Sequence, residues 1–155
     1  MIALIQRVNH ATVHVNGALI GAIDRGILAL VGMEQGDTQA TGQRLLARVL
    51  GYRIFPDGQQ RMNRSLIDIA GALLLVPQFT LVADTNKGTR PSFSSACLPE
   101  QGEVLFEALV AVARSIFPRV ASGCFGADMQ VGLINDGPVT FCLRAAPRPP
   151  AGRAD

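Results

Sequence analysis

Two polar segments at the ends of apolar runs are the residues best suited to chemistry. Gln78 and Thr80 flank Phe79 directly after the apolar run 73–76, and the segment 135–140, Asn-Asp-Gly-Pro-Val-Thr, stands directly before Phe-Cys-Leu. An amide and a hydroxyl at a strand end can position a substrate or a water molecule, because side chains that break a local pattern are often functional. Both segments also suit ordinary turns, the second especially, since Asn, Asp, Gly and Pro form turns. The residues alone leave site and turn open for each segment.

The usual nucleophile and metal-ligand sets are poorly represented. His10 and His14 would share one face of a strand, so a metal pair is conceivable, but neither a third ligand nor an HExxH pattern accompanies them. A solvated strand face is therefore the favoured interpretation of the two histidines. A Ser-His-Asp triad lacks its GxSxG signature, and neither a Walker A loop nor a GxGxxG loop supports a nucleotide cofactor. The pattern indicates no metal and no cofactor.

The cysteines indicate a cellular compartment more than a site. Cys97, Cys124 and Cys142 form an odd set without a CxxC pair. Their number and spacing argue against a disulfide scaffold and against a zinc site, and they are typical of a protein of the reducing cytoplasm. Cys124 and Cys142 stand among apolar residues, so we expect both thiols to be buried and inert.

The elements around these residues are short strands and two amphipathic helices. The Asn-Gly pair at 16–17 lies between alternating runs and predicts a hairpin, because a type I′ turn needs positive φ at both central residues. The continuous apolar run 27–33 predicts a buried strand. Apolar residues at helical spacing predict one helix over about 38–51 and another from Pro99 to a stop at Pro118.

The second half of the chain predicts further strands. A buried-strand run lies within 71–82, and Pro77 marks its end, an edge or a bulge, because proline cannot donate to a ladder. Residues 83–96 are polar and loop-like, and 120–143 predicts β-structure with a break at 135–138. The proline-rich tail 145–155 has little to bury, so we expect it to be disordered.

These elements predict the fold class. We expect a single compact α/β domain over residues 1–144, with mostly antiparallel β-sheets in a barrel-like arrangement and two amphipathic helices, because hairpin-length connections dominate. A chain of 155 residues has the size of one domain and can build its own core.

Charge and hydropathy limit the partners and the location. Of 14 cationic side chains only Lys87 is a lysine, and the net charge of +2 is too small to attract nucleic acid without a local basic patch. No apolar run reaches the about 18–20 residues of a membrane helix, and the first apolar stretch is too short for a signal peptide. We therefore expect a cytoplasmic protein with no membrane association.

Several motifs, in the right order, resemble those of the D-aminoacyl-tRNA deacylase family. They are Gln-Arg-Val at 6–8, Arg-Ile-Phe at 53–55, Met-Asn at 62–63, Pro-Gln-Phe-Thr-Leu at 77–81, the segments 83–93 and 125–131, and Asn-Asp-Gly-Pro-Val-Thr at 135–140. The resemblance implies a homodimeric enzyme that hydrolyses the ester between a D-amino acid and the 3′-terminal adenosine of tRNA. It also implies action on glycine attached to non-cognate tRNA, a role in chiral proofreading during translation, and no need for a metal or cofactor.

The resemblance implies roles for individual residues as well. Gln78 and Thr80 would line the catalytic pocket, and Phe79 would lie by the terminal adenine. The main-chain oxygens of a cis Gly137–Pro138 pair would bind the α-amino group of the substrate in the active site of the partner subunit. Arg7 would steady that turn.

Two cations follow the first motif closely. Lys87 and Arg90 stand within about ten residues of Pro-Gln-Phe-Thr-Leu, and they suit contact with the phosphates of the tRNA acceptor stem. A solvated turn is the alternative interpretation of this segment.

The chain departs from the usual family pattern at Pro77, where the family generally has serine. Proline has neither a hydroxyl nor an N–H, so any hydrogen bond made by that serine is absent here. An animal branch that tolerates some L-substrates also carries proline at this place, together with a trans Gly-Pro bond. The complete motif at 135–140 resembles the D-specific branch instead.

The chemistry expected of Thr80 is positioning, not attack. No neighbouring histidine or carboxylate in the sequence would activate its hydroxyl, so the 2′-hydroxyl of the substrate would handle the proton, as the resemblance implies. Two rival interpretations remain: a thiol or threonine hydrolase of small esters that uses Cys124 or Thr80, and a non-catalytic module that binds RNA ends.

Overall fold

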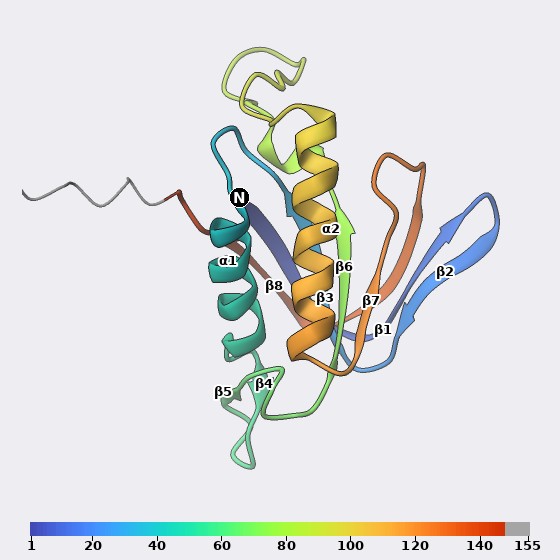
Figure 1. Cartoon of the computed structure of the whole chain (residues 1–155). Helices are drawn as coiled ribbons and strands as arrows, with labels where there is room; N and C mark the ends of the chain where they lie inside the picture. Colours follow the sequence, from blue (N-terminus) through green and yellow to red (C-terminus); the bar gives the residue numbers. More distant parts are fainter. Residues whose placement is uncertain (148–155) are drawn as a thin grey trace, which may run out of the picture.

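One mixed sheet and two helices make up the fold of the computed structural model, which describes residues 1–147 (Figure 1). The strand order in the main sheet is β2-β1-β3-β6-β7, and β8 pairs with β1. The strands are β1 (Ile2–Val15), β2 (Ala18–Ile23), β3 (Gly26–Gly32), β6 (Ala72–Pro77), β7 (Val120–Ser122) and β8 (Gln130–Arg144). The helices are α1 (Gln39–Gly51) and α2 (Pro99–Ile116), and a small ribbon of β4 (Phe55–Pro56) and β5 (Met62–Arg64) and a 3₁₀ helix, η1 (Phe79–Val82), complete the set.

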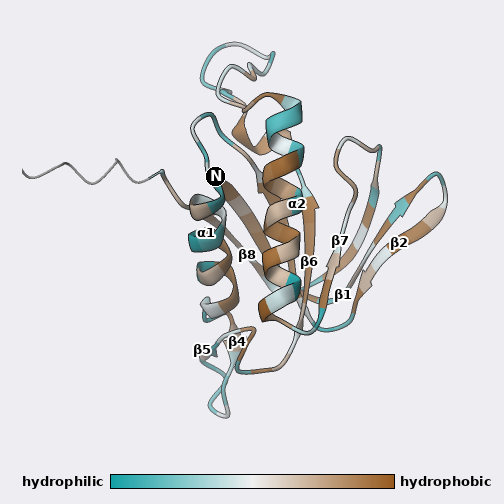
Figure 2. Ribbon diagram, in the orientation of Figure 1, coloured by the Kyte–Doolittle hydropathy of each residue, from teal (hydrophilic) through white to brown (hydrophobic). Residues whose placement is uncertain are grey.

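The predicted hairpin and both predicted helices are confirmed. Asn16 and Gly17 have φ of 49° and 79°, and they join the antiparallel strands β1 and β2. The side chains of Thr38 and Thr41 form a capping box at the start of α1, and α2 begins at Pro99. Each helix turns an apolar side toward the sheet, and apolar residues also run along β6 (Figure 2).

The strand pairing is mostly antiparallel, as expected, but the sheet also contains two parallel pairs that hairpin-length connections did not predict. β1 pairs antiparallel with β2, β3 and β8, but β3 with β6 and β6 with β7 are parallel. The reason is that a helix-containing crossover joins each parallel pair, α1 after β3 and α2 after β6, whereas only antiparallel neighbours can use a short hairpin. The single α/β domain with two helices is confirmed, and its sheet is mixed.

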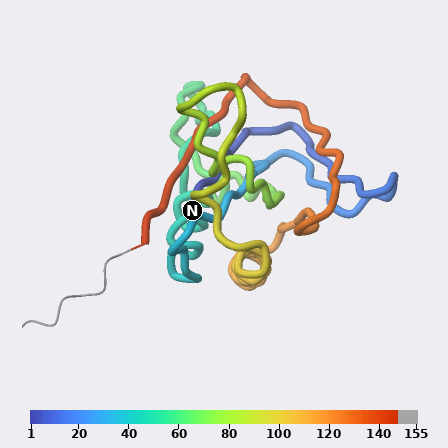
Figure 3. The backbone as a smooth tube through the Cα atoms, turned by 90° about the horizontal axis from the view of Figure 1, so that it is seen from above, coloured from blue at the N-terminus to red at the C-terminus, as the bar shows by residue number. Residues whose placement is uncertain are grey.

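The sheet curls into a barrel that is nearly closed, as the view from above shows (Figure 3). The edge strands β2 and β7 approach each other at Gly21. A Cβ atom at this glycine would lie 2.9 Å from the Ser122 carbonyl oxygen. Glycine at position 21 therefore permits the approach that brings the barrel close to closure.

Two apolar cores lie on the two sides of β3 and β6. Ile27 and Leu73 point into the core beneath the helices, whereas Leu28 and Leu74 point into the barrel interior. Burial on both faces explains why these two strands are continuous apolar runs and not alternating ones.

The last strand corrects a second expectation. β8 continues from Gln130 to Arg144 through residues 135–138, where a break was expected. Its register against β1 shifts between Gln6 and His10, so the polar segment forms an irregularity within one long strand. Of the tail expected from residue 145 onward, 148–155 lie outside the described residues, and Ala145 is buried with its N–H donating to the Met1 carbonyl at 3.0 Å.

Candidate active site

The first candidate segment lies at the carboxyl end of two parallel strands. β6 ends at Pro77, and the Gln78 N–H still donates to the Val31 carbonyl of β3 at 2.7 Å. The chain then turns into η1, which packs over Gly32. A Cβ atom at Gly32 would lie 2.9 Å from Val82 Cγ1, so glycine allows η1 to sit on the end of β3.

The polar side chains of this segment contact each other. Gln78 Nε2 donates to Thr80 Oγ1 at 2.5 Å. Among the described residues, no histidine or carboxylate hydrogen-bonds the Thr80 hydroxyl, so nothing there would activate it as a nucleophile. Phe79 stands beside them with 59% of its surface exposed, and its ring packs on Phe93 at a centroid distance of 5.0 Å and a tilt of 51°.

The second candidate segment is held by Arg7 of β1. Arg7 Nε donates to the Asp136 carbonyl at 2.8 Å, and its Nη1 donates to the Ile54 carbonyl at 2.6 Å. The Asp136 carboxylate also lies 3.3 Å from Nε, and the Arg7 side chain is only 12% exposed. A planar guanidinium with several donors can join two backbone segments in this way, whereas a lysine would offer a single point of charge.

The turn itself depends on glycine and on Asn135. Gly137 has φ of +147°, and a Cβ atom there would lie 2.8 Å from the Val139 nitrogen, so a side chain would be strained. Asn135 Oδ1 accepts the Val139 N–H at 2.6 Å, and its Nδ2 donates to Thr140 Oγ1 at 2.9 Å. The Gly137–Pro138 peptide bond is cis, the form that the resemblance implies.

The two candidate segments lie at opposite ends of the sheet. η1 packs on Gly32 at the end of β3, whereas Arg7, which holds the Gly137–Pro138 turn, pairs with Ile27 near the start of β3. Five residues of strand separate these two points, which is about 17 Å at about 3.3 Å per residue. Within one chain, the structure therefore does not bring Gly137–Pro138 to Gln78.

The predicted basic loop lies beside the first segment. Residues 83–97 form an exposed loop above the end of the sheet that carries η1 (Figure 1). Its base is closed by two hydrogen bonds between the main chains of Asp84 and Ser92, at 2.8 and 3.0 Å. Lys87 and Arg90 are exposed, and neither forms an ion pair with any residue in the described range 1–147.

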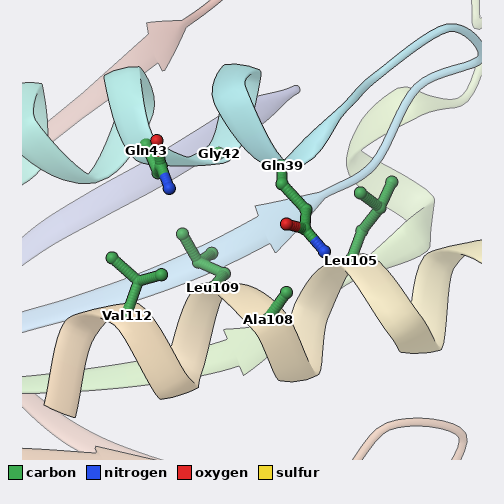
Figure 4. A pocket seen from close by; sticks show the side chains of 7 residues that line it. All are labelled: Gln39, Gly42, Gln43, Leu105, Ala108, Leu109 and Val112. Atoms are coloured by element: carbon green, nitrogen blue, oxygen red, sulfur yellow. The ribbon is translucent and has the colours of Figure 1, made fainter. Parts of the chain in front are cut away.

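Two hollows lie beside the helices, and neither is lined by residues of the two candidate segments or of the basic loop. The gap between α1 and α2 is lined by aliphatic side chains of α2 and by two glutamines of α1 (Figure 4), and at about 10 Å³ it has room for no more than a water molecule. A wider groove of about 320 Å³ runs beside α2 and includes Cys124.

The thiols differ from the expectation of burial. Cys124 and Cys142 are exposed, because one lies in the irregular chain after β7 and the other on the open face of β8. The Cys124 thiol has the Phe125 carbonyl oxygen at 3.7 Å, and within residues 1–147 no histidine is its partner. Cys97 is half-buried, and burial, with a smaller effect of the Asp37 charge, raises the pKa of its thiol.

The histidines lie away from the η1 segment. His10 and His14 lie on the part of β1 that pairs with residues 130–134 of β8, beyond the start of β3, whereas η1 lies at the end of β3. Within residues 1–147 no three His, Cys, Asp or Glu side chains gather as metal ligands would, and no helix in that range is long and apolar enough to cross a membrane.

Two contacts within the site were not predicted from the sequence. Asn135 braces the turn through its side chain, and Phe93 supports the ring of Phe79. Phe93 stands 14 positions after Phe79 in a polar loop, so no periodicity indicated the contact. The position of Asn135 at the start of a turn-forming segment was a signal, since Asn side chains commonly bond the backbone of turns.

Known proteins resemble this chain over nearly its whole length. The family model described as D-Tyr-tRNA(Tyr) deacylase matches residues 4–144. A D-aminoacyl-tRNA deacylase of Methylococcus capsulatus is 60% identical over 153 residues, covering 98% of this chain and 100% of that relative. A D-aminoacyl-tRNA deacylase of Ectopseudomonas mendocina is 61% identical over 140 residues, covering 90% of this chain and 97% of that relative.

A solved structure supports the same relationship. The protein called c-Myc DNA Unwinding Element Binding Protein superposes with a TM-score of 0.90 at 37% identity, covering 95% of this chain and 100% of that chain. The similarity thus includes both polar segments, the curled sheet and the two helices that cover it. This chain belongs to the D-Tyr-tRNA(Tyr) deacylase family.

Proposed function

We propose that this protein is a D-aminoacyl-tRNA deacylase that removes D-amino acids, and glycine on non-cognate tRNA, from the 3′ end of tRNA. The observation that carries the proposal is the family match over residues 4–144, together with relatives of about 60% identity that bear this name. Chiral proofreading in the cytoplasm follows from that activity.

The exposed η1 segment is the proposed catalytic end of the site. Gln78 and Thr80 would orient the ester and a water molecule, and Phe79 would support the terminal adenine. An aminoacyl ester is already activated, so a positioned water and donors for the developing oxyanion suffice, and backbone N–H groups near Phe79 and Thr80 are the available donors. Water adds to the acyl carbon, the bond from this carbon to the ribose oxygen breaks, and the proton passes to the ribose with help from the 2′-hydroxyl.

The selective end of the site would come from a second copy of the chain. The main-chain oxygens of Gly137 and Pro138 would bind the α-amino group and occupy the volume that an L side chain needs. The separation of about 17 Å along β3 supports this proposal, because the turn cannot serve the η1 of its own chain. Exclusion by main-chain atoms requires no particular substrate side chain, so a broad range of D-substrates is compatible with sharp chiral selection.

The loop beside η1 would hold the nucleic acid. Lys87 and Arg90 are exposed cations without ion-pair partners among residues 1–147, so their charges are available to acceptor-stem phosphates. We further propose that residues 1–144 form the functional domain.

The direct experiment compares two substrates that differ only in chirality. Purified protein at nanomolar concentration should release tyrosine from D-tyrosyl-tRNA and spare L-tyrosyl-tRNA. Release from small D-amino acid esters alone would support the thiol or threonine hydrolase instead. Tight binding of both charged tRNAs without release would support the RNA-end-binding module.

A further inference from the structure

Asp37 is a buried carboxylate that the proposed reaction does not use. It is 2% exposed and precedes Thr38, the N-cap residue of α1. One Asp37 oxygen accepts the Glu34 N–H at 2.7 Å, and both oxygens lie within 2.8 Å of the Met1 ammonium. A carboxylate that is matched in charge and fully hydrogen-bonded can fix the backbone around it.

The backbone that Asp37 fixes is the turn 34–37, and this turn holds the loop beside the candidate site. The Gln35 N–H donates to the Ser95 carbonyl at 3.0 Å, and Gln35 Nε2 donates to the Ser94 carbonyl at 2.7 Å. Gln35 of this turn therefore hydrogen-bonds two successive residues of the loop, Ser94 and Ser95.

The loop in turn carries the ring that supports Phe79. Phe93 directly precedes Ser94, it is 40% exposed, and its ring lies 5.0 Å from that of Phe79. A base that stacks on an aromatic side chain gains most when the ring is already fixed in place, because ordering a mobile side chain costs free energy on binding.

We propose that Asp37 is a positioning residue for the deacylation site. It acts through the turn 34–37 and Phe93, and it keeps Phe79 ready to receive the terminal adenine. The inference rests on the proposed function, but the connection from Asp37 through the turn 34–37 to the loop consists of the hydrogen bonds described above.

The test is Asp37→Asn, with Asp57→Asn as the matched control. Asp57 also accepts backbone N–H groups in a turn, from Gln59 at 2.8 Å and Arg61 at 3.0 Å, but its turn lies between β4 and β5. For Asp37→Asn we expect the KM for D-tyrosyl-tRNA to rise about fivefold, near the low end of what stacking one base contributes. Its kcat should stay within about twofold, because binding and not chemistry is affected. Asp57→Asn should leave both constants unchanged.

Amide hydrogen exchange supplies a readout that does not depend on activity. In Asp37→Asn, exchange should accelerate in residues 92–97 and stay slow in β3 and β6. Equal acceleration in β3 and β6, or a KM equal to that of Asp57→Asn, would overturn the proposal. Gln35→Ala is the second variant, for use if Asp37→Asn does not fold, because it removes an exposed side chain and leaves the core intact. A normal KM and normal exchange of residues 92–97 in Gln35→Ala would overturn the proposal.

The two hypotheses fail in different ways. Wild-type protein that releases no tyrosine from D-tyrosyl-tRNA would refute the proposed function. Unchanged exchange of residues 92–97 in both Asp37→Asn and Gln35→Ala would refute the positioning link, whatever the activity of the wild-type protein.

Discussion

Arg7→Lys should show whether the Gly137–Pro138 turn depends on the hydrogen bonds of Arg7 or only on its positive charge. Lysine keeps the positive charge but can hold only one of the two carbonyl oxygens, those of Asp136 and Ile54, that Arg7 reaches through Nε and Nη1. A hydrogen bond from a charged donor contributes about 1.5–3 kcal/mol, so we expect the free energy of unfolding to fall by about that amount. Because the turn would shift, kcat/KM for D-tyrosyl-tRNA should fall by up to about 100-fold, the cost of a misplacement of about 1 Å.

The assay is urea unfolding at one fixed protein concentration, followed by single-turnover deacylation. Arg25→Lys is the matched control, because Arg25 lies 5.7 Å from the centroid of the Phe55 ring at the same end of the sheet and does not hold the turn. For Arg25→Lys, the free energy of unfolding should fall by no more than about 1 kcal/mol, the usual size of an exposed cation–π contact, and kcat/KM should equal that of the wild type. Equal stability and equal kcat/KM in the two variants would refute the anchoring role of Arg7.

Three further predictions concern Thr80, the basic loop and the thiols. Thr80→Ala should keep substantial activity, because no described residue can activate the hydroxyl; complete loss of turnover with normal tRNA binding would instead indicate a nucleophile. Changing Lys87 and Arg90 together to alanine should raise KM and reduce the salt dependence of binding by about 1–2 phosphate contacts; an unchanged salt slope would assign both to a solvated loop. Iodoacetamide at pH 8 should label Cys124 faster than Cys97, whose thiol pKa is raised mainly by burial, so that less thiolate forms; equal labelling rates, read by peptide mass spectrometry, would contradict this.

Local signals predicted the elements that depend on local physics. The Asn-Gly hairpin at 16–17, the start of α2 at Pro99 and the end of β6 at Pro77 each depend on the backbone preferences of one or two residues. The pairing of β3 with β6 depends on packing across a helix-containing crossover. Their continuous apolar runs indicate burial on both faces, but they do not indicate which strands are neighbours. That is why the parallel part of the sheet escaped prediction.

In the candidate site too, the features that depend on neighbouring residues were predicted and the contacts between distant residues were not. Gln78, Thr80 and the segment 135–140 stood out because polar residues interrupt apolar runs. The support of Phe79 by Phe93, and of the turn 34–37 by Asp37, brings together residues from separate loops. Such contacts follow from the three-dimensional fold, and no spacing in the chain encodes them.

The exposed thiols show how sequence context can mislead. Cys142 stands between Phe141 and Leu143 in the sequence. Successive side chains of β8 point to opposite faces, so these two neighbours face the interior and the Cys142 thiol lies on the open face. An apolar neighbourhood in the sequence indicates a strand, but the period of two decides which side chain is buried.

Subunit complementation tests most directly the claim that two copies of this chain build one deacylase site. One variant carries Gln78→Ala with Phe79→Ala, and the other carries Gly137→Ala, whose added Cβ would lie 2.8 Å from the Val139 nitrogen. Each should be nearly inactive alone on D-tyrosyl-tRNA. After co-refolding in equal amounts, half of the dimers should be mixed, each with one intact site, so about one quarter of the wild-type activity should return. A mixture no more active than the average of its two parts would contradict the shared site, as would a fully active monomer in light scattering.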